Sequence, residues 1–105
     1  MNLDEWAREI HEIAVEHGWW DEERSFGEVV ALCHSELSEA LEADRRGEAM
    51  VEERDGKPEG VAVEMADCLI RILDWFGRVG IDPEIVVKEK VKYDRWRPYR
   101  HGKRY

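Results

Sequence analysis

The chain has 105 residues, 43% of them hydrophobic and 39% charged, which predicts one folded domain and argues against a disordered chain. Its net charge of −9 is uneven: residues 1–87 hold 8 Lys and Arg against 23 Asp and Glu, whereas residues 88–105 hold 8 against 2. The acidic body excludes general binding of nucleic-acid polymers, but the basic tail suits a small phosphorylated ligand, an acidic neighbouring subunit or simple solvation.

Two helices are predicted in the first half of the chain. The first covers about residues 3–17, where apolar residues recur at helical spacing, and Gly18 follows as a suitable stop. The second covers about residues 25–46. Ser25 and Glu28 form the sequence pattern of a capping box, in which each side chain satisfies an amide of the first helical turn.

Residues 47–60 form the connection to the next helix. They contain three glycines, one proline and many charges, with few large apolar residues. No alternation of apolar and polar residues persists, so strands are not expected. We predict a long loop here, and the segment expected to be most mobile.

The third predicted helix covers about residues 61–79 and is apolar almost all round, which is typical of a central, buried helix. A narrow polar line interrupts it, formed by Glu64, Asp67, Arg71 and Asp74. Asp74 lies one turn after Arg71 and is expected to be its ion-pair partner.

The fourth predicted helix covers about residues 82–95. Asp82 is a suitable N-cap, Pro83 occupies the first helical position, and the helix ends before Pro98. A basic tail, residues 96–105, follows. Four helices with short to moderate connections predict an all-α, antiparallel four-helix bundle that forms one domain.

Export and membrane signals are absent from the sequence. The first residues are acidic and lack the apolar core of a secretory signal peptide, and no apolar run approaches roughly 18 residues. Cys33 and Cys68 lie outside any C-x-x-C motif and are expected to be small core residues rather than a disulfide or zinc framework. We therefore expect a cytoplasmic protein without a membrane partner.

Two pairs of acidic residues carry the chemistry. Glu36 and Glu39 are three residues apart on the second helix, and Glu64 and Asp67 repeat this spacing on the third. Four carboxylates cannot be buried together without compensation, because desolvation and repulsion would protonate them. A hard divalent cation would remove this cost, and carboxylate oxygens favour Mg²⁺ or Mn²⁺ over zinc.

A simpler interpretation makes each acid an exposed helix residue that pairs with Arg71 or Arg45. Trp19 and Trp20 also have two interpretations. They could stack on a nucleobase, or they could cover the end of the bundle. His34, next to the first acidic pair, is expected to be a surface or interface residue.

Residues 34–42 (HSELSEALE), followed by residues 64–67 (EMAD), resemble the MazG-like nucleotide pyrophosphohydrolases of the all-α NTP pyrophosphatase superfamily. Their signature is E-x-x-E, a variable gap and E-x-x-D. Residues 17–20 (HGWW), 24–28 (RSFGE) and 90–102 (KVKYDRWRPYRHG) are also similar to segments of the short members. The resemblance covers most of the chain.

The resemblance implies Mg²⁺-dependent hydrolysis of (deoxy)nucleoside triphosphates to monophosphate and pyrophosphate, which could clear non-canonical nucleotides. The metal and catalytic residues that it implies are Glu36, Glu39, Glu64 and Asp67. The substrate-binding residues are Lys90, Asp94, Arg97 and Trp20. Lys90 and Arg97 would contact the phosphates.

Two positions depart from the pattern of these proteins. Ser35 replaces a Glu that many members carry, which could alter the metal arrangement. Asp94 replaces an Asn, and an ionised Asp would repel phosphate unless it ligates a metal. Two other functions therefore remain open: a phosphoribosyl-ATP pyrophosphohydrolase, and a non-catalytic helical module that binds nucleotide or metal.

The sequence also predicts self-association. A chain this short has little interior in which to bury five tryptophans and a helix that is apolar almost all round. The short members of the resembled family are dimers or dimers of dimers. We expect a homo-oligomer, at least a dimer and preferably a tetramer, with the third helix at or near the interface.

Overall fold

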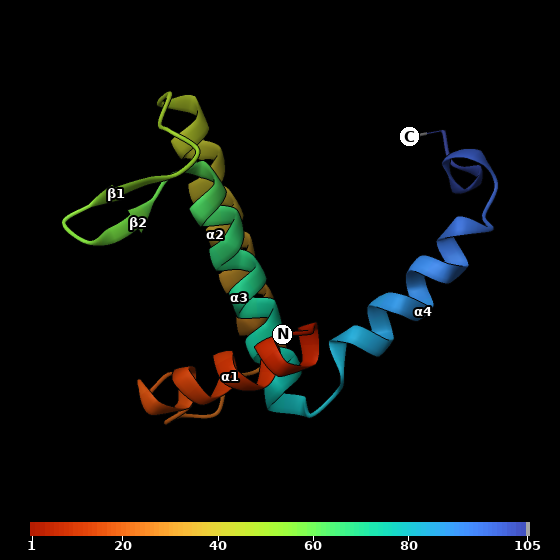
Figure 1. Ribbon diagram of the computed structural model, residues 1–105, viewed down its shortest axis with the longest axis horizontal. Helices are drawn as coiled ribbons and strands as arrows, with labels where there is room; N and C mark the ends of the chain where they lie inside the picture. Colours follow the sequence, from red (N-terminus) through yellow and green to blue (C-terminus); the bar gives the residue numbers. More distant parts are fainter. Residues whose placement is uncertain (105) are drawn as a thin grey trace.

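A computed structural model describes residues 1–104 of the chain, so Tyr105 of the tail lies outside the described residues. The chain is mostly helical, and the four helices begin and end within one residue of the predicted positions. In chain order the elements are α1 (Leu3–Glu16), α2 (Phe26–Arg45), β1 (Glu52–Arg54), β2 (Lys57–Glu59), α3 (Val61–Val79), α4 (Pro83–Arg95) and a 3₁₀ turn, η1 (Tyr99–Gly102) (Figure 1).

Side-chain caps determine where three of the helices begin. The predicted capping box of α2 is confirmed, because Ser25 Oγ accepts the Glu28 amide at 3.2 Å and Glu28 interacts back with the Ser25 amide. A second capping box starts α1, where Asn2 Oδ1 accepts the Glu5 amide at 2.9 Å. Asp82 caps α4 as predicted, with the Glu84 amide 2.8 Å from Oδ1.

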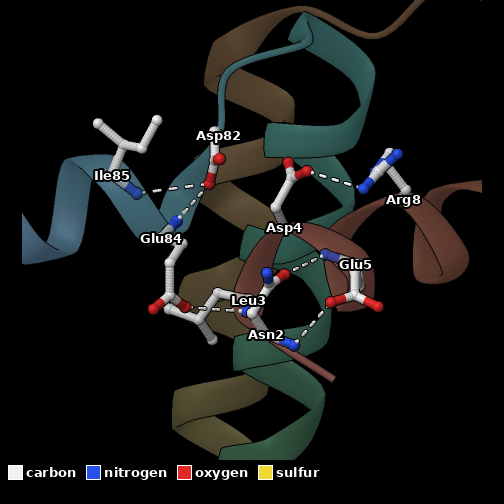
Figure 2. A network of polar contacts seen from close by, with 8 residues as sticks. All are labelled: Asn2, Leu3, Asp4, Glu5, Arg8, Asp82, Glu84 and Ile85. Atoms are coloured by element: carbon white, nitrogen blue, oxygen red, sulfur yellow. Dashed lines mark hydrogen bonds and ion pairs between the residues drawn. The ribbon is translucent and has the colours of Figure 1, made fainter.

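The start of α4 is tied to the start of α1. The Leu3 amide donates to the Glu84 carboxylate at 3.0 Å, so the first turns of the two helices share one polar network (Figure 2). Pro83, at the first position of α4, is fully buried beside this network. These contacts fix the direction in which α4 leaves the rest of the chain.

The loop expected at residues 47–60 contains a short antiparallel hairpin, so this prediction is wrong. Strand β1 pairs with β2, with Arg54 opposite Lys57. Asp55 and Gly56 form the turn with φ values of 52° and 79°, the positive values that an Asp-Gly turn of a hairpin adopts. The strands were missed because their residues are almost all charged and none is β-branched.

Helix α3 packs along α2, and α1 crosses one end of this pair (Figure 1). The contact with α1 requires Gly77. A Cβ at this position would lie 2.5 Å from His11 Cβ and 2.6 Å from the Ala7 carbonyl oxygen. The buried apolar side chains form a small core: Ala7, Val29, Ala40, Ala43, Cys68 and Leu73.

Helix α3 is not buried all round within one chain, contrary to expectation. Only Cys68 and Leu73 of this helix are buried, whereas Met65, Leu69 and Ile72 are 53%, 51% and 40% exposed. The reason is that, among residues 1–104, only α1 and α2 pack extensively against α3. Its remaining apolar side is open.

Helix α4 diverges from α2 and α3, and its packing within the chain is mainly against α1 (Figure 1). The Cα radius of gyration is 16.2 Å, whereas a compact domain of this length has about 13 Å. The described residues of one chain are therefore all-α in character, apart from the hairpin, but α4 does not close a bundle with them. No helix among residues 1–104 is long and apolar enough to cross a membrane.

Candidate functional site

The packing of α2 on α3 brings acidic residues from both helices together. Glu36, Glu64 and Asp67 each place one carboxylate oxygen within 4.8 Å of the other two. Glu36 is buried, and the other two are half-buried. We call these three residues the acidic cluster.

The fourth predicted residue, Glu39, lies outside this group of oxygens and is exposed. It nevertheless acts on Glu64, because the Glu39 carboxyl is, after burial, the largest cause of the raised pKa of Glu64. The structure thus brings three predicted ligands together and leaves the fourth at the edge of the cluster.

Glu64 has the most perturbed carboxyl group of the site. Its Oε2 atom is buried and has no hydrogen-bond partner among the described residues. Burial, with the Glu39 carboxyl as the next cause, raises the pKa of Glu64 from 4.5 to about 7. Burial and the neighbouring Glu36 also raise the pKa of Asp67. Glu64 and Asp67 therefore hold protons more tightly than isolated carboxylates would.

Arg71 partly compensates this charge. Its Nε–H donates to Glu36 Oε1 at 2.7 Å, and both side chains are largely shielded, at 26% and 12% exposure. The pairing with Arg71 that the simpler interpretation expects thus holds for Glu36, but its exposed position does not, because Glu36 is buried. The predicted ion pair between Arg71 and Asp74 is wrong, because Arg71 reaches across to α2 instead.

The residues of the cluster fit a hard divalent cation. All three offer carboxylate oxygens, the donors that Mg²⁺ and Mn²⁺ prefer. A cation would also supply the partner that Glu64 Oε2 lacks and would offset the burial and the neighbouring negative charges that raise the pKa of this group. The donor set contains no His or Cys, which argues against zinc.

A cavity of about 510 Å³ opens beside the cluster. Glu36 and Asp67 line it, together with Trp19, Trp20 and apolar residues of α1, α2 and α3. A largely apolar cavity that adjoins a set of carboxylates can bind a ligand with a flat apolar part and a charged part.

The two tryptophans take different positions in this cavity. Trp19 is 47% exposed, and the guanidinium groups of Arg24 and Arg71 lie 5.5 and 5.2 Å from its ring centroid. Trp20 is fixed by Asp74, because its Nε1–H lies 3.0 Å from both carboxylate oxygens. Both tryptophans line the cavity.

Asp74 joins the site in a role that the sequence did not indicate. Besides Trp20, it contacts His11 Nδ1 at 2.7 Å, so it links α1 and the segment after α1 to α3. His11 and Trp20 also pack edge to face, with ring centroids 5.7 Å apart. Spacing along the chain could not reveal this group, because its members come from three separate segments.

Lys90 and Arg97, two of the predicted substrate-binding residues, gather around Asp94 on α4. Asp94 Oδ1 accepts from Lys90 Nζ at 2.9 Å and lies 3.5 Å from Arg97 Nη1. The hydrogen bond from Lys90 is the main reason that the pKa of Asp94 is lowered. Because α4 diverges from α2 and α3, these residues come together with one another and not with the acidic cluster of their own chain (Figure 1).

The remaining singled-out residues play no part in these contacts. His34 and Ser35 are exposed on α2, as expected for His34. Cys33 is half-buried and Cys68 buried, and both are free thiols. No family model, no curated protein and no solved structure matches the chain.

Proposed function

We propose that the protein is a metal-dependent pyrophosphohydrolase of (deoxy)nucleoside triphosphates, which releases nucleoside monophosphate and pyrophosphate. The observation that carries this proposal is the acidic cluster, in which the buried Glu64 Oε2 lacks a partner, next to a largely apolar cavity. The resemblance of the E-x-x-E and E-x-x-D segments to MazG-like enzymes supports the same reaction.

Glu36, Glu64 and Asp67 would hold Mg²⁺, or Mn²⁺ as a substitute. The metal, when bound, would neutralise phosphate charge and lower the pKa of an attacking water. Glu39 is exposed beside Glu64, so it can orient this water or accept its proton.

The cavity would accept the base and sugar. The ring of Trp19 offers a partly exposed aromatic face, and Arg71, 5.2 Å from this ring, places a cation between the face and the cluster. Trp20 is held by Asp74 and would form a fixed wall rather than an adaptable contact. Lys90 and Arg97 would bind the phosphates, which requires α4 to lie near a cluster.

We also propose that the protein is a homo-oligomer, which is at least a dimer, with a tetramer favoured over a dimer. The open apolar side of α3, formed by Met65, Leu69 and Ile72, supports an interface there. A second copy would complete the helical bundle that one chain leaves open. Two-fold symmetry would then give equivalent sites.

One observation favours a second function, a non-catalytic module that binds nucleotide or metal. Arg71 neutralises Glu36, and a proton on Glu64 would remove a second negative charge, so the cluster can persist without a cation. Such a module would bind without turnover.

Pyrophosphate release from a panel of nucleoside triphosphates in the presence of Mg²⁺ distinguishes these functions. The enzyme is expected to release pyrophosphate with at least one substrate and to stop in excess EDTA. Glu64→Gln should abolish release, whereas Glu53→Gln, on the exposed strand β1, should not. Saturable Mn²⁺ binding without any release would favour the module, and turnover in EDTA would contradict the proposed metal site.

A further inference from the structure

The cavity and the hairpin of β1 and β2 lie on opposite sides of the acidic cluster along α3. The residues of α3 that line the cavity are Asp67 and three that follow it, Ile70, Arg71 and Asp74. The hairpin leads into the start of α3, and β2 packs against this helix (Figure 1). Glu64 and Asp67 lie in the first two turns of α3. A ligand that extends from the cavity toward the start of α3 therefore crosses the cluster before it reaches the hairpin.

The residues of α2 have the same order. Val29, Leu32 and Glu36 line the cavity. Glu39, about one turn beyond Glu36, is not among the described residues that line it, and its carboxyl acts on Glu64. Both helices thus place the cavity on one side of the cluster, with Glu39 and Glu64 toward the other side.

The hairpin is fixed to the start of α3 through the backbone. The amides of Val61 and Ala62 donate to the carbonyl oxygens of Ala49 and Met50 at 3.1 and 2.9 Å. Gly60 makes this close junction possible, because its φ is 126° and a Cβ here would lie 2.5 Å from the Met50 carbonyl oxygen. The first two amides of α3 are used within the chain, so they do not serve an anionic ligand.

Lys57 is the less constrained of the two cations of the hairpin. Arg54 forms ion pairs with Glu52 and Glu59, at 2.5 and 3.4 Å. Lys57 lies directly after the turn of the hairpin, and its side chain is 76% exposed. Its Nζ atom approaches a carboxylate only at 3.9 Å, from Glu59 Oε1. The ammonium group can therefore turn toward a ligand without breaking a close ion pair.

The charge of Lys57 also acts on the acidic cluster. Burial and the neighbouring Glu36 raise the pKa of Asp67, whereas the positive charges of Arg71 and Lys57 act in the opposite direction. Arg71 already donates to Glu36 at 2.7 Å. Lys57 thus brings positive charge to the side of the cluster that faces away from the cavity, and no close contact occupies it.

We infer that the hairpin forms a binding subsite for the terminal phosphates of a nucleotide, and that Lys57 binds the part of the triphosphate that leaves as pyrophosphate. With the base in the cavity, the phosphates cross the cluster and end at the hairpin. The direction of the ligand rests on the proposed function. The binding of metal-bound pyrophosphate by the cluster and Lys57 does not require turnover.

Calorimetric titration of pyrophosphate into Mg²⁺-saturated protein tests the subsite without any assay of activity. Lys57→Ala should raise the dissociation constant of pyrophosphate about tenfold or more, because a charge-assisted contact is lost. Mn²⁺ binding without pyrophosphate should be unchanged or tighter, because the variant removes a charge that opposes the cation. A purely structural role of Lys57 would not shift the two affinities in this way.

Two further variants serve as controls. Lys57→Arg keeps the charge at an exposed position and should bind pyrophosphate within about threefold of the wild type. Lys88→Ala removes a lysine of similar exposure, 73%, from α4 and should bind like the wild type. The inference is wrong if Lys57→Ala binds pyrophosphate normally, if it loses Mn²⁺ and pyrophosphate affinity equally, or if the Mg²⁺-saturated wild type does not bind pyrophosphate.

Product inhibition locates Lys57 along the ligand in the active enzyme. Lys57→Ala should weaken inhibition by pyrophosphate by the same factor as binding. Inhibition by the nucleoside monophosphate, which lacks the terminal phosphates, should stay unchanged. Equal losses for both products would place Lys57 elsewhere and overturn the inference. If Lys57→Ala loses pyrophosphate binding but the wild type hydrolyses no triphosphate, only the proposed function is contradicted.

Discussion

Arg71 of α3 donates its Nε–H to Glu36 Oε1 of α2 at 2.7 Å, inside the group of residues that would hold a metal ion. The chain thus supplies its own cation to one member of the acidic cluster. Glu64 has no such partner for its Oε2 atom and has a raised pKa instead. The two carboxylates are therefore stabilised differently: Glu36 by an ion pair with Arg71, and Glu64 by the proton that its raised pKa favours. Substitutions at Arg71 and at Glu64 are expected to have different effects.

Arg71→Ala is expected to destabilise the metal-free protein by about 1–3 kcal/mol, because it leaves the buried Glu36 without a counter-charge. Mg²⁺ should recover part of the loss, since the cation would replace the guanidinium. Urea unfolding in EDTA and in Mg²⁺ measures both effects. Arg8→Ala is the control, because Arg8 is 70% exposed and pairs with Asp4 at the surface, where the loss should be within about 0.5 kcal/mol. Equal losses for both variants would contradict this account.

Glu64→Gln is expected to stabilise the metal-free protein above pH 7. The folded state binds the Glu64 proton more tightly than the unfolded chain between pH 4.5 and about 7, so this group lowers stability as pH rises through that interval. Gln cannot ionise, so the variant avoids this loss of stability. Its free energy of unfolding at pH 8 should exceed that of the wild type by about 1–2 kcal/mol, once solvent screening of this half-buried group is allowed for.

Thermal unfolding in EDTA at pH 5 and pH 8 tests whether Glu64→Gln is more stable than the wild type. The advantage of Glu64→Gln should appear at pH 8, shrink toward pH 5 and reverse with saturating Mg²⁺, because the variant cannot gain from the ion. Glu53→Gln on β1 should show no such change. A variant that is less stable than the wild type at pH 8 in EDTA would contradict the raised pKa.

Helix boundaries were predictable because local chemistry determines them. Ser25 with Glu28, and Asp82 followed by Pro83, cap their helices through side chains that lie within three residues of the amides they bind. The hairpin was missed because its signal, the Asp55–Gly56 turn, lies between charged strands without a buried face.

The acidic cluster could be predicted in part, because an i, i+3 pair on each of two helices requires only that the helices pack together. The role of Asp74 could not, since His11 and Trp20 reach it from segments that the sequence does not link to α3. The course of α4 was also beyond the sequence. Residues close in sequence determine where α4 begins and how long it is. The direction of α4, in contrast, depends on the hydrogen bond between Leu3 and Glu84, which are far apart in the chain.

Gly77→Ala is expected to destabilise the fold by about 1–3 kcal/mol, because the new methyl group would overlap His11 Cβ and the Ala7 carbonyl oxygen. Displacement of α1 would also disturb the cavity, so both stability and nucleotide binding should fall. The control is Gly27→Ala, where the nearest atom is Ser25 Oγ at 3.9 Å and the gain in helix propensity should be neutral or stabilising. Urea unfolding measures the free energy of unfolding of both variants. Equal values would contradict a close contact between α1 and α3 at Gly77.

Lys90→Ala/Arg97→Ala should weaken triphosphate binding more than metal binding, because these cations would contact phosphate and not the metal ligands. We expect KM for the triphosphate to rise about tenfold or more, with the Mn²⁺ affinity of the free protein within about twofold of the wild type. Lys88→Ala, which removes one positive charge from α4, should leave KM nearly unchanged. An unchanged KM in the double variant would mean that Lys90 and Arg97 do not bind the phosphates.

Leu69→Gln/Ile72→Gln is expected to shift the protein toward monomer, because it places polar groups on the open side of α3 that a second copy would cover. Each side chain is at least 40% exposed in one chain, so the substitution should cost the fold of a monomer little while removing apolar burial worth about 25 cal/mol per Å² from the interface. Sedimentation equilibrium at micromolar concentration measures the association, and circular dichroism checks that the helices persist. Glu42→Gln, at an exposed position of α2, is the control and should leave the assembly unchanged. If the wild type itself sediments as a fully active species of 12.4 kDa, the proposed interface on α3 is wrong.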